Sequence, residues 1–253
     1  MRNIDLHKTA IKISDFIADR VATARAEGVV IGLSGGVDSA LAAALCVDAV
    51  GVANVYGMML PCESAEEDCA DAVTAADHLG IAREIVDLTK TYEALLVSLP
   101  GLDNKLARAN LKSRLRMCSL YARANQRNYL VCGTTNMVEM YLGYFTKFGD
   151  GGCDIEPLVC LLKREVREMT ALKKFPQDIV LRTASAGLWK GQTDEGDIGL
   201  SYARLDAAVL SFKDPSVTAP DEDRAVVWRM FNRSAHKREM PREVTEPVYE
   251  CEL

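Results

Sequence analysis

The apolar positions of the chain alternate between helical and strand patterns. Residues 4–26 carry apolar side chains at near-helical spacing and predict a helix, which we expect Gly28 to end. The continuous apolar run that follows predicts a buried strand. The same alternation continues through the first half of the chain. It predicts strands at 29–33, 55–60, 81–88 and 129–132, and helices at 4–26, 38–50, 64–79 and 103–126.

Strands that alternate with helices predict an α/β fold with a Rossmann-like, doubly wound parallel sheet and helices on both of its faces. Residues 183–199 are rich in Gly, Ser, Thr and Asp and predict a long loop, a type of segment that often acts as a lid. Helical patterns resume over 200–235, and a tail is expected from Pro241 onward. We expect a single domain over 1–253.

Composition narrows the classes of partner. The formal net charge of −6 argues against a broad basic surface for nucleic acid. No apolar run approaches membrane-spanning length, and the first residues lack the apolar core of a signal peptide. We therefore expect a cytoplasmic protein without nucleic-acid or membrane partners. The eight cysteines form no CxxC pair, so the sequence predicts reduced thiols and neither a zinc knuckle nor a redox motif.

The stretch GLSGGVDS at 32–39 lies between a predicted strand and a predicted helix. Backbone N–H groups at a helix N-terminus form an anion site, and the serine hydroxyls add donors. The adjacent glycines Gly35 and Gly36 permit positive φ and a close approach of the ligand to the backbone. The stretch therefore predicts a phosphate-binding loop at the carboxyl edge of the sheet, where parallel α/β folds bind ligands.

This loop matches neither the GxxxxGK[ST] pattern nor the GxGxxG pattern of other phosphate-binding loops. It lacks the lysine of the GxxxxGK[ST] pattern and carries Asp38, whose carboxylate would repel phosphate unless a metal ion lay between them. Asp38 is thus a candidate Mg²⁺ ligand, since magnesium bridges carboxylate and phosphate oxygens. The alternative is a glycine-rich turn in which Asp38 merely caps a helix.

SGGVDS resembles the pyrophosphate-binding loop of the ATP pyrophosphatases, also called adenine nucleotide α-hydrolases. Further stretches resemble one branch of that superfamily, the NAD synthetases, in the same order along the chain. These stretches are NLKSRLRM (110–117), VCGTTNMVEMYLGYFTKFGDGGCDIEPL (131–158), LLKREVREM (161–169), SAGLWKGQTDEGDIGLSYARLD (185–206) and AHKREMP (235–241). A series that covers nearly the whole chain is far more specific than a single motif.

The resemblance implies ATP and Mg²⁺ as the bound groups, and it implies a role for each matching position. The positions that match ATP-binding residues are Gly32, Leu33, Ser34, Gly35, Gly36, Val37, Asp38, Ser39, Thr134, Lys163 and Ser185. The positions that match Mg²⁺ ligands are Asp38 and Glu139, and those that match residues holding deamido-NAD are Arg114, Lys147, Asp154, His236 and Lys237. Taken singly, most of these residues are better explained as solvated surface charges or helix caps, and it is their joint spacing that favours the roles implied by the resemblance.

The implied reaction is the amidation of deamido-NAD by ammonia, with ATP converted to AMP and pyrophosphate through an acyl adenylate. Lys163 would be catalytic because it would neutralise charge on the phosphates. Asp150 is a candidate for holding or deprotonating ammonium, because it lies in a glycine-rich stretch between the Mg²⁺ ligand and the substrate ligands.

The resemblance also implies a homodimer, in which the helix at 103–126 is a reasonable interface element. The match occupies the chain and leaves no room for a glutaminase domain, so we expect free ammonia as the nitrogen donor, and nothing in the sequence indicates a separate glutaminase. Two alternatives stay open. One is a related amidating or adenylating enzyme with a different acceptor, and the other is a non-catalytic nucleotide-binding protein.

Overall fold

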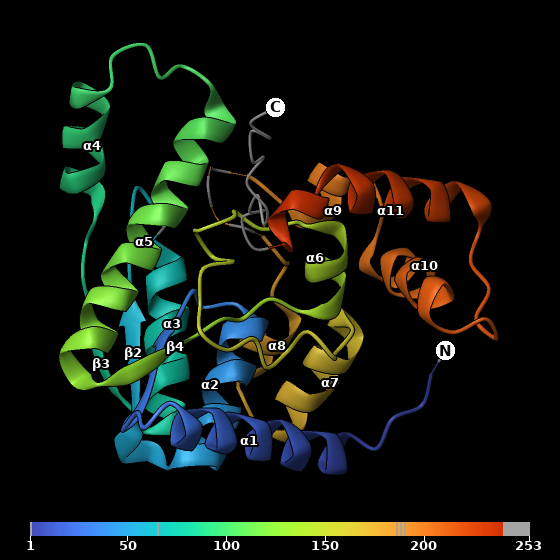
Figure 1. Ribbon diagram of the computed structural model, residues 1–253, viewed down its shortest axis with the longest axis horizontal. Coiled ribbons are helices and arrows are strands. Elements are labelled where there is room, and N and C mark those ends of the chain that lie inside the picture. The colour runs from blue at the N-terminus through green and yellow to red at the C-terminus, as the bar shows by residue number, and fades with distance from the viewer. Residues whose placement is uncertain (1, 65, 186, 188, 190, 240–253) are drawn as a thin grey trace, which may run out of the picture.

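The computed structural model describes residues 2–64, 66–185, 187, 189 and 191–239. Its centre is a parallel sheet of four strands in the order β3-β2-β1-β4 (Figure 1). The strands are β1 (Gly28–Gly32), β2 (Val55–Met59), β3 (Ala82–Ile85) and β4 (Tyr129–Cys132). In register, Val29 of β1 faces Val55 of β2 and Leu130 of β4. An isolated parallel bridge between Cys132 and Ile155 extends the sheet beyond β4.

Helices cover both faces of this sheet, as the alternating pattern predicts (Figure 1). Alternate residues of β1 point to opposite faces. Val29 and Ile31 pack in one apolar cluster with α1 and α2, whereas Val30 packs in another with residues of α4 and α5. The helices of the sheet region are α1 (Leu6–Thr23), α2 (Val37–Val50), α3 (Glu66–Leu79), α4 (Thr89–Ser98) and α5 (Lys105–Arg127), with a short 3₁₀ turn, η1 (Val52–Asn54), before β2.

The chain after β4 builds a second group of helices beside the sheet (Figure 1). Its apolar cluster joins Val138 of α6 to Leu205 and Val209 of α10 and Val227 of α11. The elements of this group are α6 (Met137–Leu142), α9 (Asp194–Ile198), α10 (Tyr202–Lys213), α11 (Asp221–Arg233) and the 3₁₀ turn η2 (Ala235–Lys237). The buried side chains of α7 (Lys163–Leu172) and α8 (Gln177–Leu181) pack instead against helices of the sheet region, chiefly α2. Within the described residues, no helix is both long and apolar enough to cross a membrane.

The structure differs from the sequence analysis at three places. Gly28 does not end the first helix, because α1 stops at Thr23 and Arg25 takes a left-handed conformation (φ 55°), which leaves Gly28 to begin β1. Helix α4 was not predicted, and its only fully buried side chain is Tyr92, so it lacks a continuous apolar stripe. The predicted loop at 183–199 contains the short helix α9, whose Thr193 cap accepts a hydrogen bond from Gly196 N–H.

The described cysteines are all free thiols, while Cys251 and the predicted tail from Pro241 lie outside the described residues. Buried Cys46 and Cys132 have their sulfur atoms 3.7 Å apart in the core between α2 and β4. They behave there as small apolar side chains.

The start of β1 has no room for a side chain at Gly28. A Cβ there would lie 2.2 Å from the backbone oxygen of Asn54 and 2.7 Å from the ring of Tyr129. We expect Gly28→Ala to lower the free energy of unfolding by about 3 kcal/mol, because overpacking against backbone cannot relax cheaply. Gly32→Ala in the same strand is the control, since its nearest neighbour would be Leu120 at 3.5 Å. Urea unfolding of both variants measures this, and equal stabilities would contradict it.

Candidate active site

The segment between β1 and α2 forms the predicted phosphate loop. The hydroxyls of Ser34 and Ser39 lie 3.2 Å apart, and Ser39 Oγ donates to the carbonyl of Gly36 at 3.0 Å. Gly36 N–H in turn donates to Ser34 Oγ at 3.3 Å. Gly35 has a φ of 78°, a conformation that favours glycine. The result is a tight turn that presents backbone N–H groups and two hydroxyls at the N-terminus of α2.

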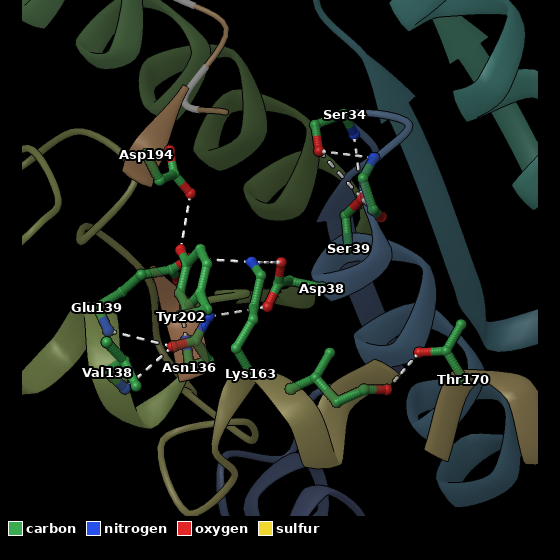
Figure 2. A network of polar contacts seen from close by, with 12 residues as sticks. Ser34, Asp38, Ser39, Asn136, Val138, Glu139, Lys163, Thr170, Asp194 and Tyr202 are labelled. Carbon is green, nitrogen blue, oxygen red and sulfur yellow. Dashed lines mark hydrogen bonds and ion pairs between the residues drawn. The ribbon is translucent and has the colours of Figure 1, made fainter. Parts of the chain in front are cut away.

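Beside this loop, a buried ammonium group joins two carboxylates. Lys163 Nζ lies 2.5 Å from Asp38 Oδ2 and 3.3 Å from Glu139 Oε1, and the lysine is 2 % exposed (Figure 2). We call Asp38, Glu139 and Lys163 the ionic centre. Its members come from the first turns of three helices, α2, α6 and α7, so the structure brings together three residues that the resemblance selected.

Asn136 fixes the two carboxylates relative to each other. As the N-cap of α6 it accepts the N–H groups of Val138 and Glu139, and its own N–H donates to Glu139 Oε2 at 3.1 Å, which completes a capping box. The side-chain amide of Asn136 donates to Asp38 Oδ1 at 3.0 Å. One fully buried asparagine therefore ties the start of α6 to the start of α2.

Burial and charge compete in the ionic centre. Burial alone would lower the pKa of Lys163, but the carboxylates of Asp38 and Glu139 outweigh it and raise that pKa above its ordinary value. Burial raises the pKa of Glu139 to about 7, an effect that Lys163 opposes and Asp38 reinforces. Lys163 thus remains an ammonium ion throughout the physiological range, and its charge holds the two carboxylates close together.

The loop from β4 to α6, which carries Thr134, rests on Glu156. Thr135 donates to this carboxylate through its N–H at 3.1 Å and through its hydroxyl at 3.0 Å. Gly133 permits this approach, since a Cβ there would meet the Glu156 carboxylate at 2.4 to 2.5 Å. Burial raises the pKa of Glu156 to about 7 against these hydrogen bonds. Sequence reasoning missed Glu156 because its role depends on a contact across the edge of the sheet.

Four of the five predicted substrate residues lie together. Arg114 donates to the carbonyl of Lys147 at 3.4 Å, and Lys147 Nζ donates to the backbone oxygen of His236. The ammonium group of Lys237 donates to two backbone oxygens just after α6, at 2.8 and 2.6 Å. In this arrangement both lysine ammonium groups hold η2 against the chain that follows α6.

Asp154 and Ser185 stand apart from that group in their contacts. Asp154 accepts a hydrogen bond from Tyr121 at 2.9 Å and one from Val131 N–H at 2.7 Å, which places it against β4 and α5. Ser185 accepts from Gly187 N–H at 3.1 Å, a local contact that does not join it to the phosphate loop.

Asp150 has a defined position. Its Oδ1 accepts from the hydroxyl of Ser113 at 2.7 Å and from Thr146 N–H at 2.9 Å. It is exposed, and it is close enough to Lys237 to oppose the lowering of the Lys237 pKa that burial causes. Asp150 therefore lies beside the predicted substrate residues.

Three further polar residues reach the site and were not predicted. Tyr202 O–H lies 3.3 Å from Glu139 Oε1 and 2.7 Å from Oδ2 of buried Asp194. Arg182, at the end of α8, donates to the carbonyl of Gly35 at 3.3 Å and forms an ion pair with Asp71. Tyr202 and Asp194 lie within the 185–206 stretch that resembles the NAD synthetases, but the resemblance gave them no role, and the contacts of Tyr202 with Glu139 and of Arg182 with Gly35 and Asp71 join elements far apart in the chain.

The described residues contain no cluster of three or more His, Cys, Asp or Glu side chains arranged to hold a metal ion. The donor set nevertheless fits Mg²⁺. Asp38 Oδ2 and Glu139 Oε1 already converge on one cation, the Lys163 ammonium group. Protein-bound Mg²⁺ uses one or two carboxylates and keeps several waters, so two are sufficient.

Comparison with known proteins identifies the family. The chain matches the family model described as NAD synthase over residues 9–241. It belongs to the NAD synthase family. The NH(3)-dependent NAD(+) synthetase of Methanosarcina mazei is 40 % identical over 250 residues, which cover 94 % of this chain and 98 % of that protein.

Solved structures of NAD synthase relatives share the fold over almost the entire chain. The NMN synthetase of Francisella tularensis superimposes with a TM-score of 0.90 at 37 % identity, covering 96 % of this chain and 100 % of that one. The NH3-dependent NAD synthetase of Campylobacter jejuni, solved with a nitrate ion, gives a TM-score of 0.82 at 26 % identity with the same coverage. The α/β fold with a doubly wound parallel sheet is thereby confirmed.

Glu156 makes stability depend on pH. Its pKa is near 4.5 in the unfolded chain and about 7 in the fold, so the stability that its protonated form provides is complete below pH 4.5 and is lost as pH rises through 7. We expect Glu156→Gln to remove this loss. The free energy of unfolding of the variant, relative to wild type, should rise by about 2 kcal/mol from pH 5 to pH 8. Urea unfolding measures it, with exposed Glu93→Gln as control, and a difference that does not change with pH would contradict it.

Proposed function

We propose that this NAD synthase family member catalyses the ATP-dependent amidation of deamido-NAD by ammonia, which yields NAD⁺, AMP and pyrophosphate. This proposal rests mainly on the ionic centre, which lies beside the phosphate loop. Simple nucleotide binding needs no buried lysine between two carboxylates at that position, and this speaks against a non-catalytic binding protein. The curated relatives named NH(3)-dependent NAD(+) synthetase support the same reaction.

The chemistry has two steps. The nicotinate carboxylate of deamido-NAD is a poor acyl donor because oxide is a very poor leaving group. Attack of a carboxylate oxygen on the α-phosphorus of ATP forms an acyl adenylate and expels pyrophosphate. Ammonia then attacks the acyl carbon, AMP leaves, and the nitrogen loses a proton to give the amide.

The protein supplies position and charge. The N–H groups and hydroxyls of the phosphate loop would hold the β- and γ-phosphates that become pyrophosphate. The Lys163 ammonium group, at the edge of that loop, would offset negative charge on the phosphates as two anions approach each other. Asp38 and Glu139 would hold Mg²⁺, which supplies further charge neutralisation when bound.

A second acceptor has specific support. The structure with a TM-score of 0.90 is that of an NMN synthetase. Nicotinate mononucleotide carries the same carboxylate on the same ring as deamido-NAD and lacks only the adenylate half. The same two steps on that substrate would give NMN, so the ionic centre does not discriminate between the two acceptors.

An end-point assay decides between these reactions. Purified protein is incubated with ATP, Mg²⁺ and ammonium, together with either deamido-NAD or nicotinate mononucleotide, and the amide product is measured beside AMP. We expect NAD⁺ and AMP in equal amounts with deamido-NAD, and no product when glutamine replaces ammonium. More NMN than NAD⁺ after the same time at equal acceptor concentrations would instead establish the second reaction, and AMP without either amide would exclude both.

We propose that Asp150 binds ammonium or accepts its proton. Two hydrogen bonds to Oδ1 hold its exposed carboxylate in a fixed place beside the residues proposed to bind deamido-NAD. Ammonia is mostly ammonium at neutral pH, so a carboxylate at this place would both attract the cation and receive a proton.

Asp150→Asn should lower kcat/KM for ammonium by roughly 100-fold, because general base catalysis contributes factors of that order. Ser113→Ala is the matched control, since it removes the hydrogen bonds of the Ser113 hydroxyl with Asp150 Oδ1 and with Asp150 N–H and keeps the carboxylate. Steady-state rates over a range of ammonium concentrations measure both variants. Equal effects of the two substitutions would show that the loop geometry matters and the carboxylate charge does not.

We propose in addition that residues 1–253 form a single synthetase domain, that the protein acts in the cytoplasm, where ATP is available, and that it forms a homodimer. Exposed Leu106, near the start of α5, supports a place for that helix in the dimer contact. The mass in solution by light scattering tests the dimer.

A further inference from the structure

Two residues of α10 reach the ionic centre from outside the sheet. Tyr202 and Asp206 are four positions apart and therefore lie on the same face of the helix. Both are buried, at 4 % and 8 % exposure. Tyr202 contacts the carboxylate of Glu139, and Asp206 contacts the backbone N–H of Lys163.

Tyr202 restrains Glu139. Its hydroxyl lies 3.3 Å from Glu139 Oε1 and 2.7 Å from Asp194 Oδ2, and its ring lies 4.9 Å from Lys163 Nζ (Figure 2). A phenol has one proton, which Tyr202 donates mainly to Asp194, the closer acceptor, and shares with Glu139 Oε1. Asp194 thus holds the Tyr202 side chain in place. The fixed ring and hydroxyl of Tyr202 limit the positions that the Glu139 carboxylate and the Lys163 ammonium group can take.

Asp206 fixes the start of α7. The cap residue of this helix, Leu162, has no side-chain oxygen to satisfy the first N–H groups. Asp206 takes that role from another helix, since Oδ1 accepts from Lys163 N–H and Oδ2 from Arg164 N–H, both at 3.2 Å. Because Lys163 is the first residue of α7, this contact sets the point from which its side chain reaches Asp38.

We propose that Tyr202 and Asp206 are positioning residues for the proposed amidation: Tyr202 orients Glu139, and Asp206 orients Lys163, so that α10 holds the ionic centre in its working geometry. The inference rests on the proposed function and adds two residues that act through others. Leu205 and Val209, which lie in the apolar cluster of the second helix group, already secure α10. The polar pair is therefore not needed merely to attach the helix.

The test compares Tyr202→Phe and Asp206→Asn with matched controls on the same helix group. Tyr141→Phe changes a tyrosine that stacks on Phe212 and Phe231, away from the ionic centre. Asp223→Asn removes a fully buried carboxylate that pairs with Arg204 of α10, so it loosens the helix without touching the centre. The readouts are melting temperature, kcat and KM for ATP, and Mn²⁺ affinity by electron paramagnetic resonance in the presence of a non-hydrolysable ATP analogue.

We expect both test variants to weaken Mn²⁺ binding and to lower kcat by roughly 10-fold, as loss of supporting contacts around metal ligands does. The two controls should lose only thermal stability. The inference is overturned if the test variants match wild type in Mn²⁺ affinity and kcat, if the controls change these quantities as much, or if wild type binds no Mn²⁺. Absence of amide product from wild type would refute the proposed function instead, and the Mn²⁺ titration would still decide the inference.

Discussion

The ion pairs of Lys163 with Asp38 and Glu139 are the constraint on which the rest of the site depends. Removing an ammonium group from water costs several kcal/mol, and only close, well-placed carboxylates offset that cost. Lys163 is almost completely buried, so its side chain can be buried only when Asp38 and Glu139 are in place beside it. Because each belongs to the first turn of a different helix, the pairs require α2, α6 and α7 to begin at one place.

The topology of the sheet provides that place. β1 and β4 are adjacent and parallel, so the chain leaves both at the same edge, and α2 and α6 both start there. Asn136 then joins the two helix starts through one side chain. Helix α7 does not follow a strand, and its start is instead held by Asp206 from α10 and by a pairing of Arg2 with buried Glu165. The second helix group therefore completes a site that the sheet alone would leave half built.

Sequence patterns predicted what depends on neighbours along the chain. The apolar runs marked four strands within a few residues, and the glycines and serines after β1 marked the phosphate loop, because turn conformation and strand burial are local properties. Such patterns could not predict the ion-pair partners of Lys163, since Asp38 lies 125 positions away and no spacing rule connects the two residues. Only the family resemblance placed Lys163, Asp38 and Glu139 in one set.

The residues that sequence reasoning missed share one property. Glu156, Tyr202 and Asp206 bind groups on other elements. They lie in stretches that resemble the NAD synthetases, but neither the resemblance nor the local pattern gave them a role. Two of the predicted substrate residues also have a structural role that the sequence did not indicate, since Lys147 and Lys237 donate hydrogen bonds to backbone oxygens. Their role in packing η2 became visible only when both ends of the contact were known.

The site separates two kinds of recognition that a synthetase of this type needs. Phosphates are suited to the backbone N–H groups of the loop, whereas Asp38 and Glu139 repel phosphate and attract cations. Lys163 lies where these two regions meet. An ammonium group bound by two carboxylates has less charge to offer a phosphate, so a second cation on those carboxylates would be what makes Lys163 available to ATP. With the proposed metal and nucleotide at these residues, binding of each would therefore depend on binding of the other.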